Sequence, residues 1–297
     1  MKPMFCWVGS KTRQWKNLSP LFDNISRTCY VEPFGGSGAV FFAKQPERYE
    51  VYNDNNRLLV NLFRSFRNND VVETFQELGL LYPMGRVFWH ELHGLCKAYL
   101  KGEKERDAYI SNMGLTQYNP DLVVAFAFFY VMRLCFAGVY KGAAFAGGCK
   151  GDTGSKSVSY RMVLSSIEEY KKRFENVLIE DIDAFDCLRR YDHTKTFFYV
   201  DPPYETETSK KYDVEWTPET TDSLVSLVSS LQGSVVLSCY NNERYERLFD
   251  YGFKSDSFKS FASSNRIKDS SCIRTETVYY RLSDYAKEKL GTDTCLF

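Results

Sequence analysis

The stretch Cys29-Tyr30-Val31-Glu32-Pro33-Phe34-Gly35-Gly36-Ser37-Gly38 decides the fold. Its apolar start predicts a short strand, and its glycines predict a tight turn that ends where the apolar run Ala39 to Ala43 begins a helix. A second strand, Tyr49 to Asn53, and a second helix, Leu58 to Phe66, follow along the chain. This alternation is typical of an open parallel α/β sheet.

The same alternation returns after a different middle segment. Residues 68–163 are first helical and then glycine-rich, with Val123 to Leu134 as their core helix. The elements expected after this segment are helices at 167–174 and 217–231 and strands at 177–179, 197–200 and 234–238. We therefore expect one discontinuous α/β domain, residues 1–67 and 164–297, with an inserted domain at 68–163.

Composition limits the classes of protein that need to be considered. Among 297 residues, 38 Lys and Arg balance 38 Asp and Glu, so any nucleic-acid surface must be a local patch. Nine cysteines, scattered and odd in number, argue against a disulfide framework and for a reduced, cytoplasmic setting. The longest apolar stretch, Leu122 to Met132, is too short to span a bilayer, and Met1 to Trp15 lacks the pattern of a secretory signal.

The tetrapeptide Asp201-Pro202-Pro203-Tyr204 follows an expected strand directly and has the parts for amine methylation. The amino group of a nucleic-acid base is a poor nucleophile because its lone pair is delocalised into the ring. A carboxylate (Asp201) and a backbone carbonyl (Pro202) can each accept one amine N–H, and an aromatic ring (Tyr204) can stack on the base. The tetrapeptide predicts such a site, although the same residues also suit a turn that ends a strand.

The glycine turn and the next strand end predict a nucleotide-like ligand. Gly35, Gly36 and Gly38 allow close approach of the backbone, and the following helix begins at the ligand. Phe41 stands where a dinucleotide fingerprint needs its third glycine, which disfavours an NAD oxidoreductase. Asp54, after the second strand, can accept the ribose hydroxyls of an adenosine cofactor or else cap the helix that follows.

Taken together, these residues make the chain resemble the Dam-type adenine DNA methyltransferases, in which the cofactor motif precedes the target-recognition region and the catalytic motif. The resemblance implies a Rossmann-like, S-adenosylmethionine-dependent methyltransferase sheet with an inserted, mainly helical target-recognition lobe. Asp201, Pro202 and Tyr204 match the family's catalytic residues. The positions that match its cofactor contacts are Trp7, Lys11, Glu32, Phe34, Gly35, Gly36, Gly38, Asp54, Asp183 and Asp201.

The resemblance also implies the reaction. A methyl group would pass from S-adenosylmethionine to the 6-amino group of an adenine flipped out of duplex DNA, leaving S-adenosylhomocysteine and needing no metal. Two alternatives remain at this stage: a catalytically silent DNA-binding relative, and an amino-methyltransferase acting on cytosine N4, RNA or a protein glutamine. A cognate restriction endonuclease is a candidate partner. We expect a monomer or weak dimer of bacterial or phage origin.

The DNA surface is expected in the middle segment. Its glycine-rich part carries several cations opposed only by Asp152, which suits a loop that follows a groove. Tyr140 is a candidate wedge beside a flipped base, and Arg133 matches a family arginine. The candidate DNA contacts are Arg133, Tyr140, Lys141, Lys150, Lys156 and Arg161. The rest of the segment departs from the Dam-type pattern, so no GATC target is implied.

A metal site is a competing interpretation of His90, His93 and Cys96, which recur at helical spacing. No fourth ligand is evident, and apolar residues flank them, so the sequence favours a packed helix without zinc.

Overall fold

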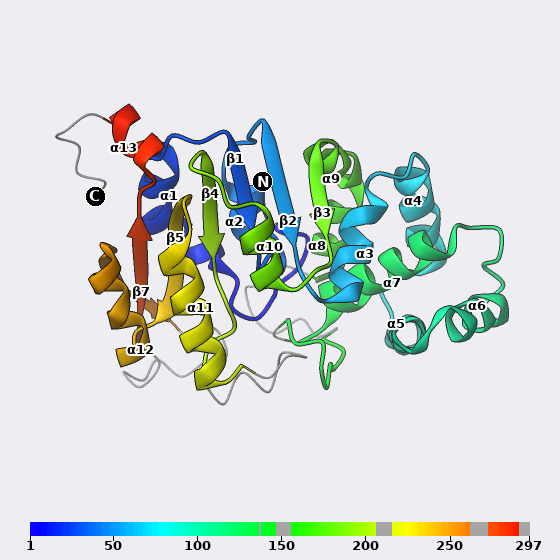
Figure 1. The fold of residues 1–297 in the computed structure, drawn as a ribbon. Helices are drawn as coiled ribbons and strands as arrows, with labels where there is room; N and C mark the ends of the chain where they lie inside the picture. The colour runs from blue at the N-terminus through cyan, green and yellow to red at the C-terminus, as the bar shows by residue number, and fades with distance from the viewer. Residues whose placement is uncertain (137, 147–155, 206–215, 262–272, 291–297) are drawn as a thin grey trace. The chain divides into compact units, whose positions relative to one another are not determined.

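The computed structural model describes the chain except for residues 137, 147–155, 206–215, 262–272 and 291–297 (Figure 1). The chain divides into two compact units. Unit 1 comprises residues 1–2, 9–55 and 180–297. Unit 2 comprises residues 3–8 and 56–179. Unit 2 is thus wider than the insertion expected at 68–163, and the assignment of target recognition to that insertion stays a prediction.

A mixed β-sheet has the strand order β3-β2-β1-β4-β5-β7-β6. The strands are β1 (Cys29–Glu32), β2 (Tyr49–Asn53), β3 (Val177–Glu180), β4 (Thr196–Val200), β5 (Ser234–Tyr240), β6 (Lys254–Phe261) and β7 (Ile273–Arg281). Strand β1 pairs in parallel with β2 and β4, and β4 with β5, whereas β7 runs antiparallel to β5 and β6. The expected Rossmann-like α/β class is confirmed.

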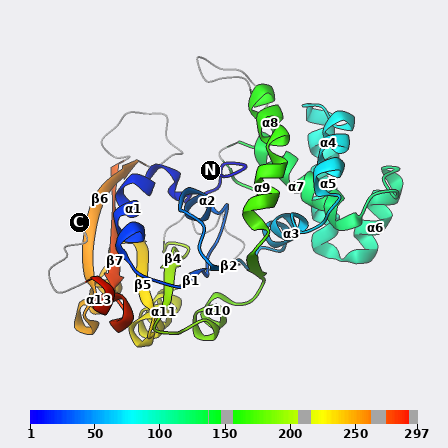
Figure 2. The same cartoon turned by 90° about the horizontal axis from the view of Figure 1, so that it is seen from above.

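Both faces of the sheet in unit 1 are covered. Figure 2 shows α1 (Trp15–Asn24) and α2 (Ala39–Ala43) on one side and α10 (Ala184–Arg190) and α11 (Pro218–Ser230) on the other. Alternate residues of β4 pack on opposite faces of the sheet. Phe197 packs edge-on against Phe22 of α1, whereas Phe198 lies in the apolar cluster with α10 and α11. Ligands of such sheets bind at the carboxyl ends of the strands, where the side chains emerge from the core.

Unit 2 is mainly helical and is organised around α7 (Pro120–Leu134). Asn119 caps this helix by accepting the Asp121 N–H at 2.9 Å, and every residue from Leu122 to Met132 is buried. The other helices of this unit are α3 (Arg57–Ser65), α4 (Val71–Leu81), α5 (Arg86–Lys101), α6 (Glu103–Asn112), α8 (Lys156–Ser165) and α9 (Ile167–Phe174). Within the described part of the chain, no helix has the length and apolar character to cross a bilayer.

The predicted elements lie within three residues of the observed bounds. The largest difference is at α7, which begins at Pro120 rather than Val123 because Asn119 and Pro120 supply a cap and a first turn. The helix expected from Thr217 begins at Pro218, since the Thr217 side chain caps it. The remaining elements are η1 (Lys11–Arg13), α12 (Glu243–Glu246), η3 (Arg247–Tyr251) and α13 (Asp284–Leu290).

Candidate active site

The catalytic tetrapeptide begins where β4 ends. All five residues of β4 are buried, and Asp201 is the first residue after them, with 18% of its side chain exposed. The two prolines have no N–H to donate, so the backbone between Asp201 and Tyr204 offers carbonyl acceptors only. This part of the chain therefore presents a carboxylate, a carbonyl and a ring at the edge of the core.

Three side chains and one backbone carbonyl of unit 1 surround the ammonium of Lys11. The Lys11 Nζ lies 2.7 and 2.8 Å from the two carboxylate oxygens of Asp201 and 3.1 Å from Glu276 Oε1. It also donates to the Tyr204 hydroxyl at 2.7 Å and to the Gly9 carbonyl at 3.2 Å. Lys11 is 3% exposed and Glu276 2% exposed, so this ion pair is shielded from water.

Burial and charge act in opposite directions on this cluster. Burial alone would lower the pKa of Lys11, but the carboxylates of Asp201 and Glu276 outweigh it and raise that pKa above its usual value. Burial raises the pKa of Asp201, Lys11 opposes the change, and the charge of Glu276 adds to it. Lys11 is thus a permanent cation whose two anionic partners compete for it.

Tyr204 is held in place by rings and by its hydroxyl. Its ring centroid lies 4.4 Å from that of Tyr240, at the end of β5, and its hydroxyl lies 3.1 Å from both Asp201 Oδ1 and Glu276 Oε1. A phenol has one proton, so it donates to one of these carboxylates at a time. Tyr204 therefore belongs to the same charged cluster while its ring remains partly exposed.

The glycine turn is fastened to the end of β2. Gly35 donates its N–H to the Asn53 carbonyl at 2.8 Å, and Gly36 donates its own to the Asp54 carboxylate at 2.8 Å. Gly36 and Gly38 have φ values of 50° and 68°, a region that favours glycine. The cap of α3 is Asn56, which accepts from two helix amides, so the alternative role of Asp54 as that cap is wrong.

The other predicted cofactor contacts of unit 1 are Glu32, Phe34 and Asp183. Glu32, at the end of β1, is buried and accepts a hydrogen bond from Tyr30 at 2.6 Å. Phe34 is half-buried, and its ring packs edge-on against Trp216 at a centroid distance of 5.7 Å. Asp183 is exposed and caps α10 by accepting the Phe185 N–H at 2.9 Å.

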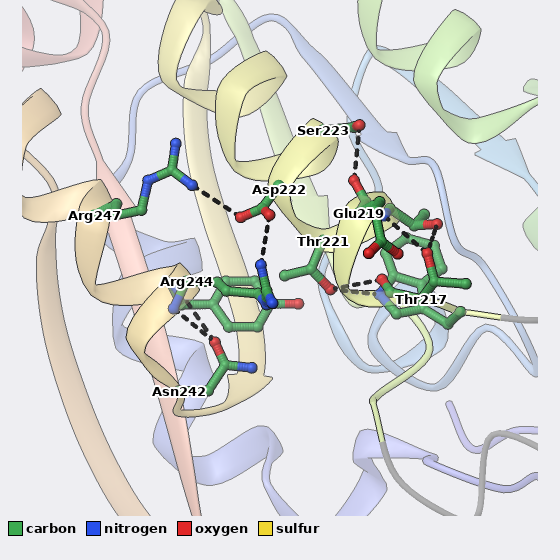
Figure 3. Close-up of polar contacts among 11 residues, drawn as sticks. Thr217, Glu219, Thr221, Asp222, Ser223, Asn242, Arg244 and Arg247 are labelled. Atoms are coloured by element: carbon green, nitrogen blue, oxygen red, sulfur yellow. Dashed lines mark hydrogen bonds and ion pairs between the residues drawn. The ribbon is translucent and has the colours of Figure 1, made fainter.

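Ion pairs join α11 to the helices that follow β5 (Figure 3). Trp216 donates from its indole to Thr221 Oγ1 at 3.0 Å, and Asp222 on the same helix pairs with Arg244 and Arg247. Both arginines follow β5, close along the chain to Tyr240. These contacts join α11 to the segment after Tyr240, whose ring packs against that of Tyr204.

Unit 2 contains Trp7 and the described candidates for DNA contact. Trp7 packs edge-on against Phe128 of α7, and Tyr140 packs against Phe128 and His93. Arg133 is half-buried and donates to the Met4 carbonyl at 3.0 Å and the Ser159 carbonyl at 3.1 Å. Lys141 and Arg161 are exposed, Lys156 begins α8, and Lys150 lies outside the described residues.

The helix with the competing metal pattern is a packed one. Cys96 and His93 are buried in α5, and burial lowers the pKa of His93 to about 4, which keeps its ring neutral. In the described ranges, no group of three or more His, Cys, Asp or Glu side chains is placed to hold a metal ion. The six cysteines described are free thiols.

Glu276 is the member of the cluster that the sequence did not identify. It lies in β7, opposite Tyr240 in the antiparallel register with β5. A charged residue within the run Thr275 to Tyr280 was the one available signal, since a carboxylate on a central strand needs a partner. The partner, Lys11, is 265 residues away along the chain and could not be identified from local pattern.

Comparison with known proteins gives the family. The chain is 25% identical over 213 residues to the type II methyltransferase M.CviBI of Paramecium bursaria Chlorella virus NC1A, which covers 69% of this chain and 70% of the relative. It is 38% identical over 68 residues to a DNA adenine methylase of Haemophilus influenzae, or 23% of each chain. The family model of D12 class N6 adenine-specific DNA methyltransferases matches residues 7–274. The chain therefore belongs to the D12 class N6 adenine-specific DNA methyltransferases.

Proposed function

We propose that Asp201, Pro202 and Tyr204 form the acceptor site of this adenine-specific DNA methyltransferase. The observation that carries the proposal is the position of Asp201 and Tyr204 at the carboxyl end of β4, joined by a 3.1 Å hydrogen bond. In this site the Asp201 carboxylate and the Pro202 carbonyl each accept one N–H of the adenine 6-amino group. Tyr204 stacks on the base, which has left the duplex because its amine cannot be reached inside the stack.

The protein's part in the reaction is to localise the amine lone pair and receive its charge. S-adenosylmethionine, which the family implies as donor, supplies a methyl group attached to a positively charged sulfur. The amine nitrogen forms a bond to that carbon while the electron pair of the broken carbon–sulfur bond stays on sulfur. The nitrogen then carries a positive charge, which Asp201 stabilises before the excess proton passes to the carboxylate or to water.

The donor site is assigned to the glycine turn and Asp54. The turn between β1 and α2 is partly exposed, and Asp54, which is half-buried, lies beside it. A carboxylate at this strand end suits the ribose hydroxyls of an adenosine group, and the half-buried Phe34 ring offers an apolar surface. These residue types fit the donor, and S-adenosylhomocysteine should bind the same site.

Asp54→Ala is expected to weaken S-adenosylhomocysteine binding by about tenfold to a hundredfold, because two charge-assisted hydrogen bonds are lost. The Gly36 N–H also loses its acceptor. Isothermal calorimetry measures the affinity. Asn56→Ala is the matched control: it removes the cap of α3 and lowers stability by about 1 kcal/mol, yet should leave donor affinity unchanged. Equal donor affinity in Asp54→Ala and the wild type would contradict the assignment.

Tyr204→Ala is expected to raise the KM for DNA and lower kcat/KM by roughly tenfold or more, since stacking of a base on an aromatic ring contributes about 1–3 kcal/mol. Tyr204→Phe keeps the ring and loses the hydroxyl that accepts from Lys11. It should therefore retain most of the activity that Tyr204→Ala loses. Steady-state kinetics with tritiated donor separates the two variants, and equal losses would assign the role to the hydroxyl.

Target recognition is assigned to unit 2. Its exposed Lys141 and Arg161 suit contact with phosphates, which gives affinity without sequence information. Tyr140 remains the candidate wedge. The guanidinium of Arg133 is engaged by two backbone carbonyls, which makes it a support for the recognition segment in this proposal. A cytoplasmic location, a restriction endonuclease partner and a monomeric or weakly dimeric state remain predictions.

The experiment for the whole proposal is methylation-sensitive sequencing of DNA from a host without adenine methylation that expresses this protein. N6-methyladenine in one short sequence context is the expected result. Chromatography of the hydrolysed nucleosides separates this product from N4-methylcytosine. Methylated cytosine would contradict the proposed fit of the site to adenine, and methyl incorporation into RNA alone would overturn the assignment of duplex DNA as substrate.

A further inference from the structure

The carboxylate that should bind the target amine already pairs with a buried cation. Both oxygens of Asp201 lie within 2.8 Å of Lys11 Nζ. An amine N–H that approaches Asp201 therefore competes with a full positive charge, which is the stronger donor. Each carboxylate oxygen can accept more than one hydrogen bond, but while Lys11 binds both oxygens its charge offsets that of Asp201. For Asp201 to offer its full charge to the amine, Lys11 must move toward another carboxylate, because Lys11 is buried and its pKa is raised.

Glu276 offers the alternative partner. Its Oε1 lies 3.1 Å from Lys11 Nζ, and its position in β7 is fixed by pairing with Tyr240 of β5 on one side and Phe258 of β6 on the other. The ammonium can thus shift toward a rigid strand without leaving hydrogen-bond range of a carboxylate. Among the residues of this cluster, only Asp201 and Tyr204 directly follow the carboxyl end of a strand, β4, which is where ligands of such sheets bind.

We propose that Glu276 is a positioning residue that takes over the Lys11 ammonium when Asp201 binds the adenine amine. The inference rests on the proposed role of Asp201 as amine acceptor. Lys11 and Glu276 then cancel each other's charge, and the charge of Asp201 is left for the nitrogen that becomes positive during transfer. Without Glu276, Asp201 would be the only carboxylate beside Lys11 in the described cluster and would stay bound to it.

Glu276→Gln is the first test, with tritiated S-adenosylmethionine and genomic DNA from a host without adenine methylation. The rate of a single turnover should fall by about tenfold, which is less than the roughly 10²- to 10³-fold loss when a group that stabilises the transition state directly is removed, because Glu276 acts through Lys11. Affinities for S-adenosylhomocysteine and for DNA should stay close to those of the wild type. Glu276→Asp, which keeps the charge, should recover part of the rate. A wild-type single-turnover rate in Glu276→Gln would overturn the inference.

The pH profile distinguishes this role from a structural one. The rate needs ionised Asp201, so it falls as the pH drops through the Asp201 pKa, which burial and Glu276 raise and Lys11 lowers. Removing the charge of Glu276 should lower this pKa and move the acid limb to lower pH, although the plateau is reduced. The pKa values of Tyr199, Tyr204 and Cys239, which face Asp201, are raised by burial, so these groups keep their protons there. If Glu276→Gln lowers the maximal rate but leaves the acid limb of the pH–rate profile at the wild-type pH, the inference is contradicted.

The Lys11→Met variant provides a second background that distinguishes a role through Lys11 from simple misfolding of Glu276→Gln. In Lys11→Met no ammonium needs neutralising, so adding Glu276→Gln should cost little further rate at saturating donor. Equal losses in the wild-type and Lys11→Met backgrounds would show that Glu276 does not act through Lys11. Asp201→Asn tests the proposed acceptor site separately from the role of Glu276. If Asp201→Asn stays active, the acceptor site itself is wrong. If Asp201→Asn is inactive but Glu276→Gln lowers the rate equally in the wild-type and Lys11→Met backgrounds, only the inference about Glu276 is overturned.

Discussion

Asp201→Ala should reduce methyl transfer to DNA by about 10³-fold or more, the largest effect expected of any single substitution in this chain. The amine would lose the carboxylate that accepts one of its protons, so its lone pair would stay delocalised into the ring. The positive charge on nitrogen would also lose its nearest anion. Single-turnover incorporation of tritiated methyl into DNA measures the rate, and calorimetry shows whether the donor still binds.

Two variants control for indirect effects of this substitution. Asp201→Asn keeps the shape and one acceptor oxygen but removes the charge, and it should also be nearly inactive. Asp222→Asn removes a carboxylate of the same unit that pairs with Arg244 and Arg247 at the surface (Figure 3). Exposed ion pairs contribute roughly 0–1 kcal/mol, so this variant should keep the wild-type rate. Methylation by Asp201→Ala above the background of the assay would contradict the catalytic role.

The sheet could be predicted because its signals are local. In β1, the turn and α2, apolar residues and glycines follow one another within fifteen residues, so the sequence of this one stretch predicts the strand, the turn and the helix together. The same holds for β4 and the tetrapeptide, where a buried strand ends in a carboxylate. Parallel strands bring their carboxyl ends to one edge, so the sequence alone predicts Asp54 beside the glycine turn, and in the structure it accepts the Gly36 N–H at 2.8 Å.

The charged cluster could not be predicted because its members come from distant parts of the chain. Lys11 matched a family cofactor contact, yet its nearest anions are Asp201 and Glu276. The position of Glu276 depends on β7 lying antiparallel between β5 and β6, and no local pattern in the sequence predicts this strand order. Likewise Arg133 carries the charge expected of a DNA contact, but backbone carbonyls hold its guanidinium.

Gly35→Ala should weaken binding of S-adenosylhomocysteine by about a hundredfold, the loss that a displacement near 1 Å can cause in an aligned site. A Cβ at this position would lie 2.2 Å from the nearest ring carbon of Tyr52, which is far below any real contact. The ring cannot move aside cheaply, because Tyr52 is fully buried and its hydroxyl donates to the Gly36 carbonyl. The turn must shift instead, and with it the Gly36 N–H that Asp54 binds.

Gly252→Ala is the matched control for Gly35→Ala, because it changes a glycine of the same unit with open space around it. Its φ of 75° makes a side chain costly by about 1–2 kcal/mol, so the variant should lose thermal stability without losing donor affinity. Gly35→Ala should lose both. If the two variants bind S-adenosylhomocysteine equally well, the glycine turn is not part of the donor site. If Gly35→Ala alone loses affinity while Asp54→Ala does not, the turn binds the donor through its backbone and Asp54 serves only to fasten it.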